Sequence, residues 1–292
     1  MNPPTQPLAR LSLMLKIGRV SNLPTVWTNV VAGAFLAGVA TDTVTLLWLM
    51  LAVTLFYTGG MYLNDAFDAD IDARERPNRP IPAGQISAKA VSALGCAMLM
   101  AGIFIVAPYG VWAVQAGVGL SLAILLYNAW HKGNVWSPVI MGSCRALVYL
   151  LAAWSLTPQP SGGLVWGMLA VFTHIAGLTY AAKQESLDRI DRLWPLAILV
   201  APMVLLSLNF PLSNTAIVAL LLLAAADVIA VRLLALRRRG GDVPRAVAQL
   251  IAACALLDAA VVAVAGGSLA WVAACIVAYV CCRLFQRWIP GT

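Results

Sequence analysis

The stretch NDAFDADID, residues 64–72, holds four aspartates and one asparagine at the end of an apolar run. On a continuous helix, Asp65, Asp68 and Asp72 share one face because they are spaced three and four residues apart, whereas Asp70 points away toward water. Three carboxylates on one face repel each other unless a cation lies among them. Hard oxygen ligands favour Mg²⁺ or Ca²⁺, and Mg²⁺ commonly completes its shell with substrate phosphates. The alternative is a solvated acidic helix end without a ligand.

A basic loop rich in proline follows these acids directly. The segment ARERPNRPIPAG, residues 73–84, carries Arg74, Arg76 and Arg79. Guanidinium groups suit the paired oxygens of phosphate, and the prolines stiffen the backbone and end the helix. Acids for a cation beside arginines for phosphate predict a metal-assisted diphosphate site.

A second acidic cluster occurs in AAKQESLDRID, where Glu185, Asp188 and Asp191 are spaced three residues apart. If both clusters emerge on one side of a membrane, they could hold two metal ions around one diphosphate. Lys132, which ends the segment YNAWHK, would be a further phosphate partner. Its alternative role is that of a positively charged anchor at the membrane surface.

The composition indicates which elements position these residues. The chain has 292 residues, of which 61% are hydrophobic and 11% charged, and its mean hydropathy is +0.85. Apolar runs long enough to cross a bilayer recur along the whole chain and predict an all-α, polytopic transmembrane helical bundle of about nine to ten spans around a central cavity. We expect a single domain over residues 1–292. The expected segments are 23–40, 44–64, 88–107, 111–130, 135–156, 163–182, 194–209, 213–234, 245–265 and 268–287.

Positive charge is concentrated in alternate loops. The loops after the first, third, fifth, seventh and ninth segments contain no Lys or Arg. The positive-inside rule places both termini and both acidic clusters on the cytoplasmic side of the cell or inner membrane. The N-terminal cytoplasmic segment comprises residues 1–20. This asymmetry favours an even number of spans, ten on this count. The net charge of +7 therefore reflects topology and contact with membrane lipid, and nucleic acid is not an expected partner.

Three charged residues, Arg145, Asp227 and Asp258, lie within apolar segments. Charges at such depth are normally paired or functional. Arg145 could reach a diphosphate or the polar group of an acceptor, or pair with an acid. For the two acids we favour pairing with Arg232 or with a backbone group, and we interpret His174 as a packed polar residue without chemistry. The cysteine and histidine spacing does not fit a zinc site.

These motifs together resemble the UbiA superfamily of intramembrane prenyltransferases. NDAFDADID fits its NDxxDxxxD motif, RPIPAGQIS at 79–87 is similar to RPLPSGxIS, and YNAWHK is similar to YxxxxK. RVSNLPTVWTNVVAG at 19–33 is also similar to the first helix of the family. The resemblance covers most of residues 19–192, and the first motif with its RPIPAG continuation is the most specific part of it.

The resemblance implies a helical bundle whose cavity opens sideways to lipid. It implies Mg²⁺-dependent transfer of a prenyl group from a prenyl diphosphate to an aromatic or quinone-like acceptor in the membrane. The implied metal ligands are Asn64, Asp65, Asp68, Asp72, Glu185, Asp188 and Asp191. The expected diphosphate-binding residues are Arg76, Arg79, Lys132, Arg145 and Tyr127, and Asp65, Asp68 and Lys132 are the expected catalytic residues.

Two features depart from the family pattern. Gly177 and Gln184 stand where acids of the second motif are expected, so this site is either displaced or has lost one metal. The segment count also exceeds the nine helices typical of the family. One alternative function is therefore a UbiA-like binding or transport protein that performs no catalysis. A lipid phosphatase or phosphotransferase is a third reading, but the sequence offers no distinctive base beside the acids.

Overall fold

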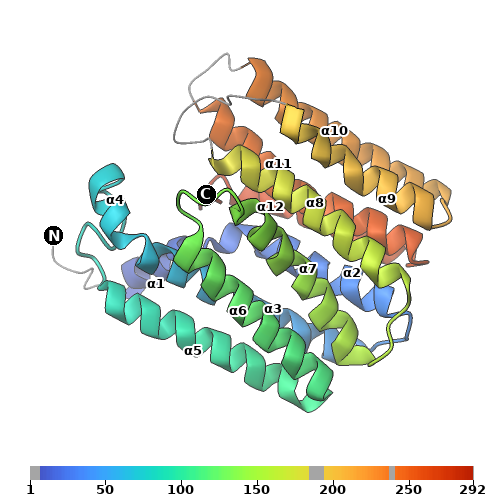
Figure 1. Ribbon diagram of the computed structural model, residues 1–292, viewed down its shortest axis with the longest axis horizontal. Coiled ribbons are helices and arrows are strands. Elements are labelled where there is room, and N and C mark those ends of the chain that lie inside the picture. The colour runs from blue at the N-terminus through green and yellow to red at the C-terminus, as the bar shows by residue number, and fades with distance from the viewer. Residues whose placement is uncertain (1–6, 184–193, 237–240, 292) are drawn as a thin grey trace.

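The computed structural model describes residues 7–183, 194–236 and 241–291, and its regular secondary structure in these ranges is helical throughout (Figure 1). The expected all-α fold is therefore confirmed. The helices are α1 (Pro7–Ile17), α2 (Leu23–Ala37), α3 (Thr43–Phe67), α4 (Ala69–Glu75), α5 (Ala88–Val106), α6 (Val111–Trp130), α7 (Ser137–Leu156), α8 (Gly163–Lys183), α9 (Ala201–Asn209), α10 (Asn214–Leu236), α11 (Asp242–Val264) and α12 (Leu269–Phe285).

Each of the ten predicted apolar segments coincides with a helix, the seventh being a short 3₁₀ stretch, η4 (Trp194–Val200), that continues into α9. Seven helices in the described chain are long and apolar enough to cross a bilayer: α3, α5 with the turn after it, α6, α7, α8, α10 and α11. The chain is an integral multi-pass membrane protein. The count of ten spans and the orientation of the termini stay predictions.

Local sequence explains several helix starts. Asp42 caps α3 by accepting a hydrogen bond from the Thr45 backbone N–H at 2.9 Å. That bond, together with one from the Thr45 hydroxyl, holds the pKa of Asp42 below its ordinary value. Ser87 caps α5 in the same way through the Ala90 N–H at 3.2 Å. Such caps satisfy N–H groups that the first turn leaves without a partner.

Two large apolar clusters form most of the core, with a smaller one beside α1, and α2 and α7 contribute to both large clusters. One cluster joins them to α8, α10 and α11, and the other joins them to α3, α5 and α6. In Figure 1, α5 and α6 lie at one edge of the bundle and α10 at the opposite edge, with α2, α7, α8 and α11 between them. Buried alanines and glycines dominate many of these interfaces, because small residues let backbones in a membrane approach closely.

The α2–α7 contact depends on one glycine. A Cβ atom added at Gly33 would lie 2.7 Å from the Tyr149 carbonyl oxygen and 2.9 Å from the Ala152 Cβ. Gly119 on α6 provides the contrast, because a Cβ there would meet no atom within 4 Å. The two positions share a residue type and a helical setting but differ in available space.

We expect Gly33→Ala to lower the free energy of unfolding by about 1–3 kcal/mol, because the added methyl group forces α2 and α7 apart. Gly119→Ala is the matched control and should leave stability unchanged or slightly higher, since Ala favours helix over Gly. Thermal unfolding of both variants in one detergent measures the difference. Equal stability of the two variants would contradict the close packing at Gly33.

Candidate substrate cavity

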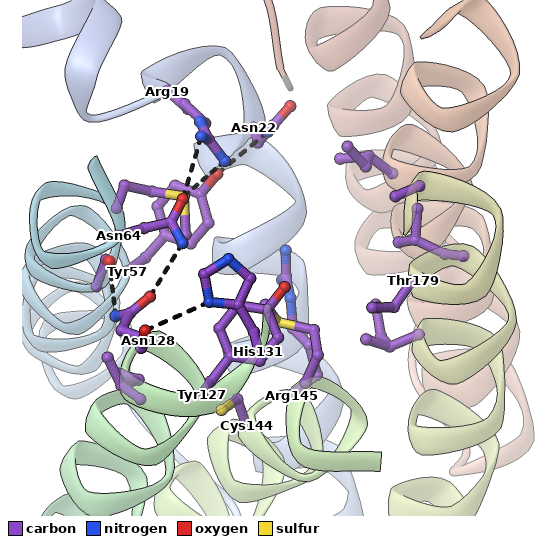
Figure 2. A pocket seen from close by; sticks show the side chains of 18 of the residues that line it. Arg19, Asn22, Tyr57, Asn64, Tyr127, Asn128, His131, Cys144, Arg145 and Thr179 are labelled. Carbon is purple, nitrogen blue, oxygen red and sulfur yellow. Dashed lines mark hydrogen bonds between the residues drawn. The ribbon is translucent and has the colours of Figure 1, made fainter. Parts of the chain in front are cut away.

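A cavity of about 470 Å³ opens among α2, α3, α6, α7, α8 and α11. Its polar lining gathers where the acidic motif lies and includes Arg19, Asn22, Asn64, Asp68, Arg76, Arg79, His131, Lys132 and Lys183. Its apolar lining includes Val26, Val53, Phe56, Leu120, Ile124, Val148, Ile175 and Ile251. Figure 2 shows polar side chains around this space, from Arg19 and Asn22 before α2, from α3 and from α6. The predicted central cavity is therefore present, with one charged part and a hydrophobic wall.

The acidic motif sits at a helix break. Helix α3 ends at Phe67, Asp68 stands between the two helices, and α4 begins at Ala69. Asn64 and Asp68 line the cavity, and Asp70 is exposed, as expected. The motif thus presents an amide and a carboxylate to the cavity from neighbouring turns.

The other two acids of the motif contact arginines. Arg79 Nη1 lies 2.8 Å from Asp72 Oδ2 and 3.5 Å from Asp65 Oδ1. Arg19 Nη2 lies 3.4 Å from Asp65 Oδ1. Two guanidinium groups therefore offset the repulsion between these carboxylates. Asp65 and Asp72 are mostly buried and are not among the lining residues, whereas their partners Arg19 and Arg79 line the cavity.

Asp68 faces His131 and Lys132, which follow α6 directly. His131 Nε2 and Lys132 Nζ each lie 3.4 Å from its Oδ2. Burial alone would raise the pKa of Asp68, but the hydrogen bonds and positive charge of these two residues outweigh it and lower the pKa below its ordinary value. Asp68 is therefore ionised at neutral pH and ties α3 to α6.

His131 is a site residue that the sequence did not reveal. Its ring stacks on Tyr127 with centroids 4.9 Å apart, and its Nδ1 lies 3.3 Å from the Asn128 carbonyl oxygen. Its place beside Lys132 in YNAWHK was the available signal. Tyr127 and Lys132 line the cavity as expected.

Asn64 on α3 is oriented by Asn128, which lies in the YNAWHK segment at the end of α6. Asn64 Nδ2 donates to Asn128 Oδ1 at 3.2 Å, and Asn128 Nδ2 donates to the Gly60 carbonyl oxygen at 3.1 Å. The Asn64 Oδ1 is thereby turned away from Asn128 and accepts from Arg19 Nη2 at 3.4 Å. Asn128 was not singled out from the sequence.

Arg19 was interpreted from the sequence only as a topological charge. The structure places it in the cavity lining, and its backbone has φ 45°, the only positive φ of a non-glycine residue in the described chain. Such a conformation costs free energy and is often found at functional sites. Its position in RVSN, at the start of the family-like first helix, was the available signal.

Asn22 connects α3 to the last described residues. Its Nδ2 donates to the Tyr57 hydroxyl at 3.1 Å and to the Gly291 carbonyl oxygen at 3.0 Å. Its Oδ1 accepts from Gln286 Nε2 at 3.1 Å. Asn22 and Gly291 both line the cavity, so the chain after α12 contributes to the cavity lining.

The buried charges deeper in the bundle correct one expectation. Asp227 lies near His174, with 3.9 Å between Oδ2 and Nδ1. Asp258 accepts hydrogen bonds from Asn29 and from two hydroxyl groups. The predicted pairing with Arg232 or a backbone group is therefore wrong for Asp258, whose partners are side chains of α2 and α7. The neighbour of Asp227 is His174 on α8, and neither oxygen of Asp227 makes a hydrogen bond within the described residues.

The second acidic cluster lies outside the described residues, including Glu185, Asp188, Asp191 and Gln184. Gly177 is described and packs on α8 against η4, where a Cβ would lie 2.8 Å from a Leu199 methyl group. An acidic side chain at Gly177 would meet this packed apolar surface. That contact accounts physically for the glycine at this position.

The donor set facing the cavity suits a hard cation. Asn64 and Asp68 offer amide and carboxylate oxygens there, and Mg²⁺ binds such oxygens with only one or two carboxylates when phosphates supply the rest. No three His, Cys, Asp or Glu side chains in the described ranges lie close enough to hold an ion by themselves. These residues therefore fit a Mg²⁺ ion that arrives with a phosphate ligand.

Comparisons with known proteins agree with this architecture. The chain is 32% identical over 166 residues to digeranylgeranylglyceryl phosphate synthase of Methanopyrus kandleri, covering 54% of this chain and 58% of that protein. It is 34% identical over 133 residues to protoheme IX farnesyltransferase of Alkalihalophilus pseudofirmus, covering 42% and 43%. The chain thus spans about half the length of the curated relatives it matches.

Solved structures show the same fold. A UbiA homolog from Aeropyrum pernix K1 matches with a TM-score of 0.67 at 18% identity, over 84% of this chain and 97% of that one. A UbiA homolog from Archaeoglobus fulgidus bound to GPP and Mg²⁺ matches with a TM-score of 0.54 at 13% identity, over 92% and 99%. The sequence model of the UbiA prenyltransferase family matches residues 25–249. The chain therefore belongs to the UbiA prenyltransferase family.

Proposed function

We propose that this protein transfers a prenyl group from a prenyl diphosphate to a hydrophobic acceptor, aromatic or quinone-like, within the membrane. The observation that carries this proposal is the composition of the cavity. Acids and cations line one part of it, and an apolar wall continues from them into the bundle. Such a cavity matches a substrate with a charged diphosphate and a long hydrocarbon tail.

We assign two roles to the charged residues of the cavity: binding of the diphosphate and binding of Mg²⁺. Arg76, Arg79 and Lys132 hold the diphosphate oxygens, with Tyr127 beside them, and Arg145 contributes to substrate binding from α7. The Mg²⁺ ligands are proposed from both motifs: Asn64, Asp65, Asp68 and Asp72, with Glu185, Asp188 and Asp191. When bound, Mg²⁺ offsets the charge that develops on the leaving diphosphate.

The chain's own residues would assist departure of the diphosphate in three ways. The contacts of Asp68 with His131 and Lys132 favour its ionised form, so its carboxylate faces the cavity already deprotonated. The basic residues stabilise negative charge where it grows. The apolar wall excludes water that would otherwise consume an allylic cation before the acceptor attacks it.

The relatives support this reaction class. Two of them are named as a digeranylgeranylglyceryl phosphate synthase and a protoheme IX farnesyltransferase, and structural neighbours hold GPP or DMAPP with Mg²⁺. For this chain we propose a cytoplasmic location of the acidic motifs and both termini, based on the distribution of Lys and Arg.

Product formation tests the function directly. Purified protein is incubated with prenyl diphosphates of several lengths, Mg²⁺ and a panel of aromatic acceptors, and products are identified by mass spectrometry. We expect a prenylated product that disappears with EDTA and returns when Mg²⁺ is restored. A protein that binds prenyl diphosphate but releases no diphosphate would instead be a binding or transport protein.

Asp68 and Asp70 provide a matched pair within the acidic motif. We expect Asp68→Asn to lower kcat/KM for prenyl transfer by about 100-fold or more, because a charge that faces the reacting group is lost. Asp70→Asn should keep kcat/KM within about twofold, since Asp70 is exposed and surface changes have small effects. Steady-state kinetics on folded variants measures both, and equal losses would contradict the role of Asp68.

Substitutions of Arg76 and Arg79 distinguish a loss of diphosphate binding from a loss of protein stability. Both line the cavity, but Arg79 also pairs with Asp65 and Asp72, whereas Arg76 forms no such pair within the described ranges. We expect each Arg→Gln variant to raise the KM for prenyl diphosphate about tenfold or more, the value of a charge-assisted hydrogen bond. Only Arg79→Gln should also lower the unfolding temperature. An unchanged KM in both variants would remove these arginines from the diphosphate site.

A further inference from the structure

Helix α11 carries a carboxylate in the middle of its apolar length. Asp258 is 0% exposed and accepts hydrogen bonds from Thr28 Oγ1, from the Tyr149 hydroxyl, and from Asn29 Nδ2 at 2.7 and 2.9 Å. It lies beyond residues 25–249, the part that matches the family. A buried acid inside a membrane bundle is costly and is retained where it is paired or functional. Asp258 is paired, and its partners lead toward the cavity.

Asp258 decides which way the Asn29 amide points. Both oxygens of the Asp258 side chain accept hydrogen bonds from the Asn29 NH₂ group, at 2.9 and 2.7 Å. The Oδ1 of Asn29 is then directed to the opposite side, where it accepts a hydrogen bond from Arg145 Nη1. Asp258 on α11 thereby orients Asn29 on α2, so that the Arg145 guanidinium on α7 faces the Asn29 carbonyl oxygen.

Arg145 is held along one edge only. Besides Asn29, it donates from Nη1 to the Thr25 carbonyl oxygen at 3.4 Å and from Nη2 to Thr25 Oγ1 at 3.3 Å. A guanidinium has five N–H donors, and these are the three hydrogen bonds that Arg145 makes within the described residues. Arg145 lines the cavity, where Figure 2 shows it beside Cys144. The remaining donors are available to a substrate oxygen.

The position of Arg145 separates it from the acidic motif. Its guanidinium carbon lies 5.9 Å from the centre of the Tyr57 ring. Tyr57 precedes Asn64 by seven residues on α3, which corresponds to about 10 Å along a helix. Arg145 therefore lies beside the turn of α3 that carries Tyr57, about two helical turns from the turn that carries Asn64.

We propose that Asp258 is a positioning residue that acts through Asn29 and fixes the Arg145 guanidinium toward a substrate oxygen in the cavity. This inference rests on the proposed function, because it assigns Arg145 to substrate binding. Asp258 itself is buried away from the cavity and touches no substrate. Its effect on the reaction passes only through the orientation of Asn29 and the placement of Arg145.

The substitution Asp258→Asn tests this relay with almost no change in size. An asparagine at this position can donate as well as accept, so Asn29 can rotate and turn its NH₂ group toward Arg145, donor against donor. We expect Asp258→Asn to raise by about tenfold the same KM, for prenyl diphosphate or for acceptor, that Arg145→Gln raises. The double variant should be no worse than Arg145→Gln alone, because both changes act on one group.

Asp227→Asn is the matched control. Asp227 is also a buried acid, on α10, and its nearest titratable neighbour is His174; neither residue lines the cavity. Its substitution should change the unfolding temperature without changing either KM. An Asp258→Asn variant that behaves like Asp227→Asn, with a stability effect alone, would overturn the proposal.

An exchange variant provides the rescue. In Asn29→Asp combined with Asp258→Asn, the carboxylate at position 29 accepts from Arg145, and the amide at position 258 donates to it. We expect KM values near those of the unmodified protein, and this variant carries the test if Asp258→Asn alone does not fold. A raised KM in the folded exchange variant would contradict the relay. Absence of transfer by the unmodified protein with every donor and acceptor would instead defeat the proposed function, and the relay with it.

Discussion

Carboxylates at the edge of a membrane and inside it require donors from other helices, and much of this structure follows from that requirement. Asp65 is reached by Arg19 from before α2, and Asp68 by His131 from the end of α6. Asp258 on α11 is reached by side chains of α2 and α7. Each of these contacts joins segments far apart in the sequence. Charge pairing therefore fixes how the helices surround the cavity, in addition to the packing of small residues between them.

The sequence was sufficient for features that depend on neighbours along the chain. Apolar runs located all ten helical segments, because the length of such a run reflects the thickness of a bilayer. Helical spacing also separated exposed Asp70 from buried Asp68. From the same spacing we predicted one metal site for the three carboxylates on one face. In the structure, Arg79 forms ion pairs with two of them, Asp65 and Asp72. The guanidinium comes from a loop whose path follows from the fold.

Residues missed in the sequence share a physical reason. Arg19 had an adequate explanation as a positive charge beside a membrane segment, and His131 as a neighbour of Lys132. Their roles come from contacts with α3 across the bundle, and spacing within one segment carries no information about such contacts. The same holds for Asp227, whose neighbour His174 lies on α8.

The contact of Gly291 with the cavity has a practical consequence for biochemistry. Gly291 accepts a hydrogen bond from Asn22 and lines the cavity, so bulk attached close to Gly291 is attached beside the cavity. An affinity tag or fluorescent fusion there is expected to lower the measured turnover by crowding the cavity, an effect unrelated to the activity of the protein itself. Purification handles for kinetic work are therefore better placed before α1, whose helix packs beside α3 through Leu13 and Ile17.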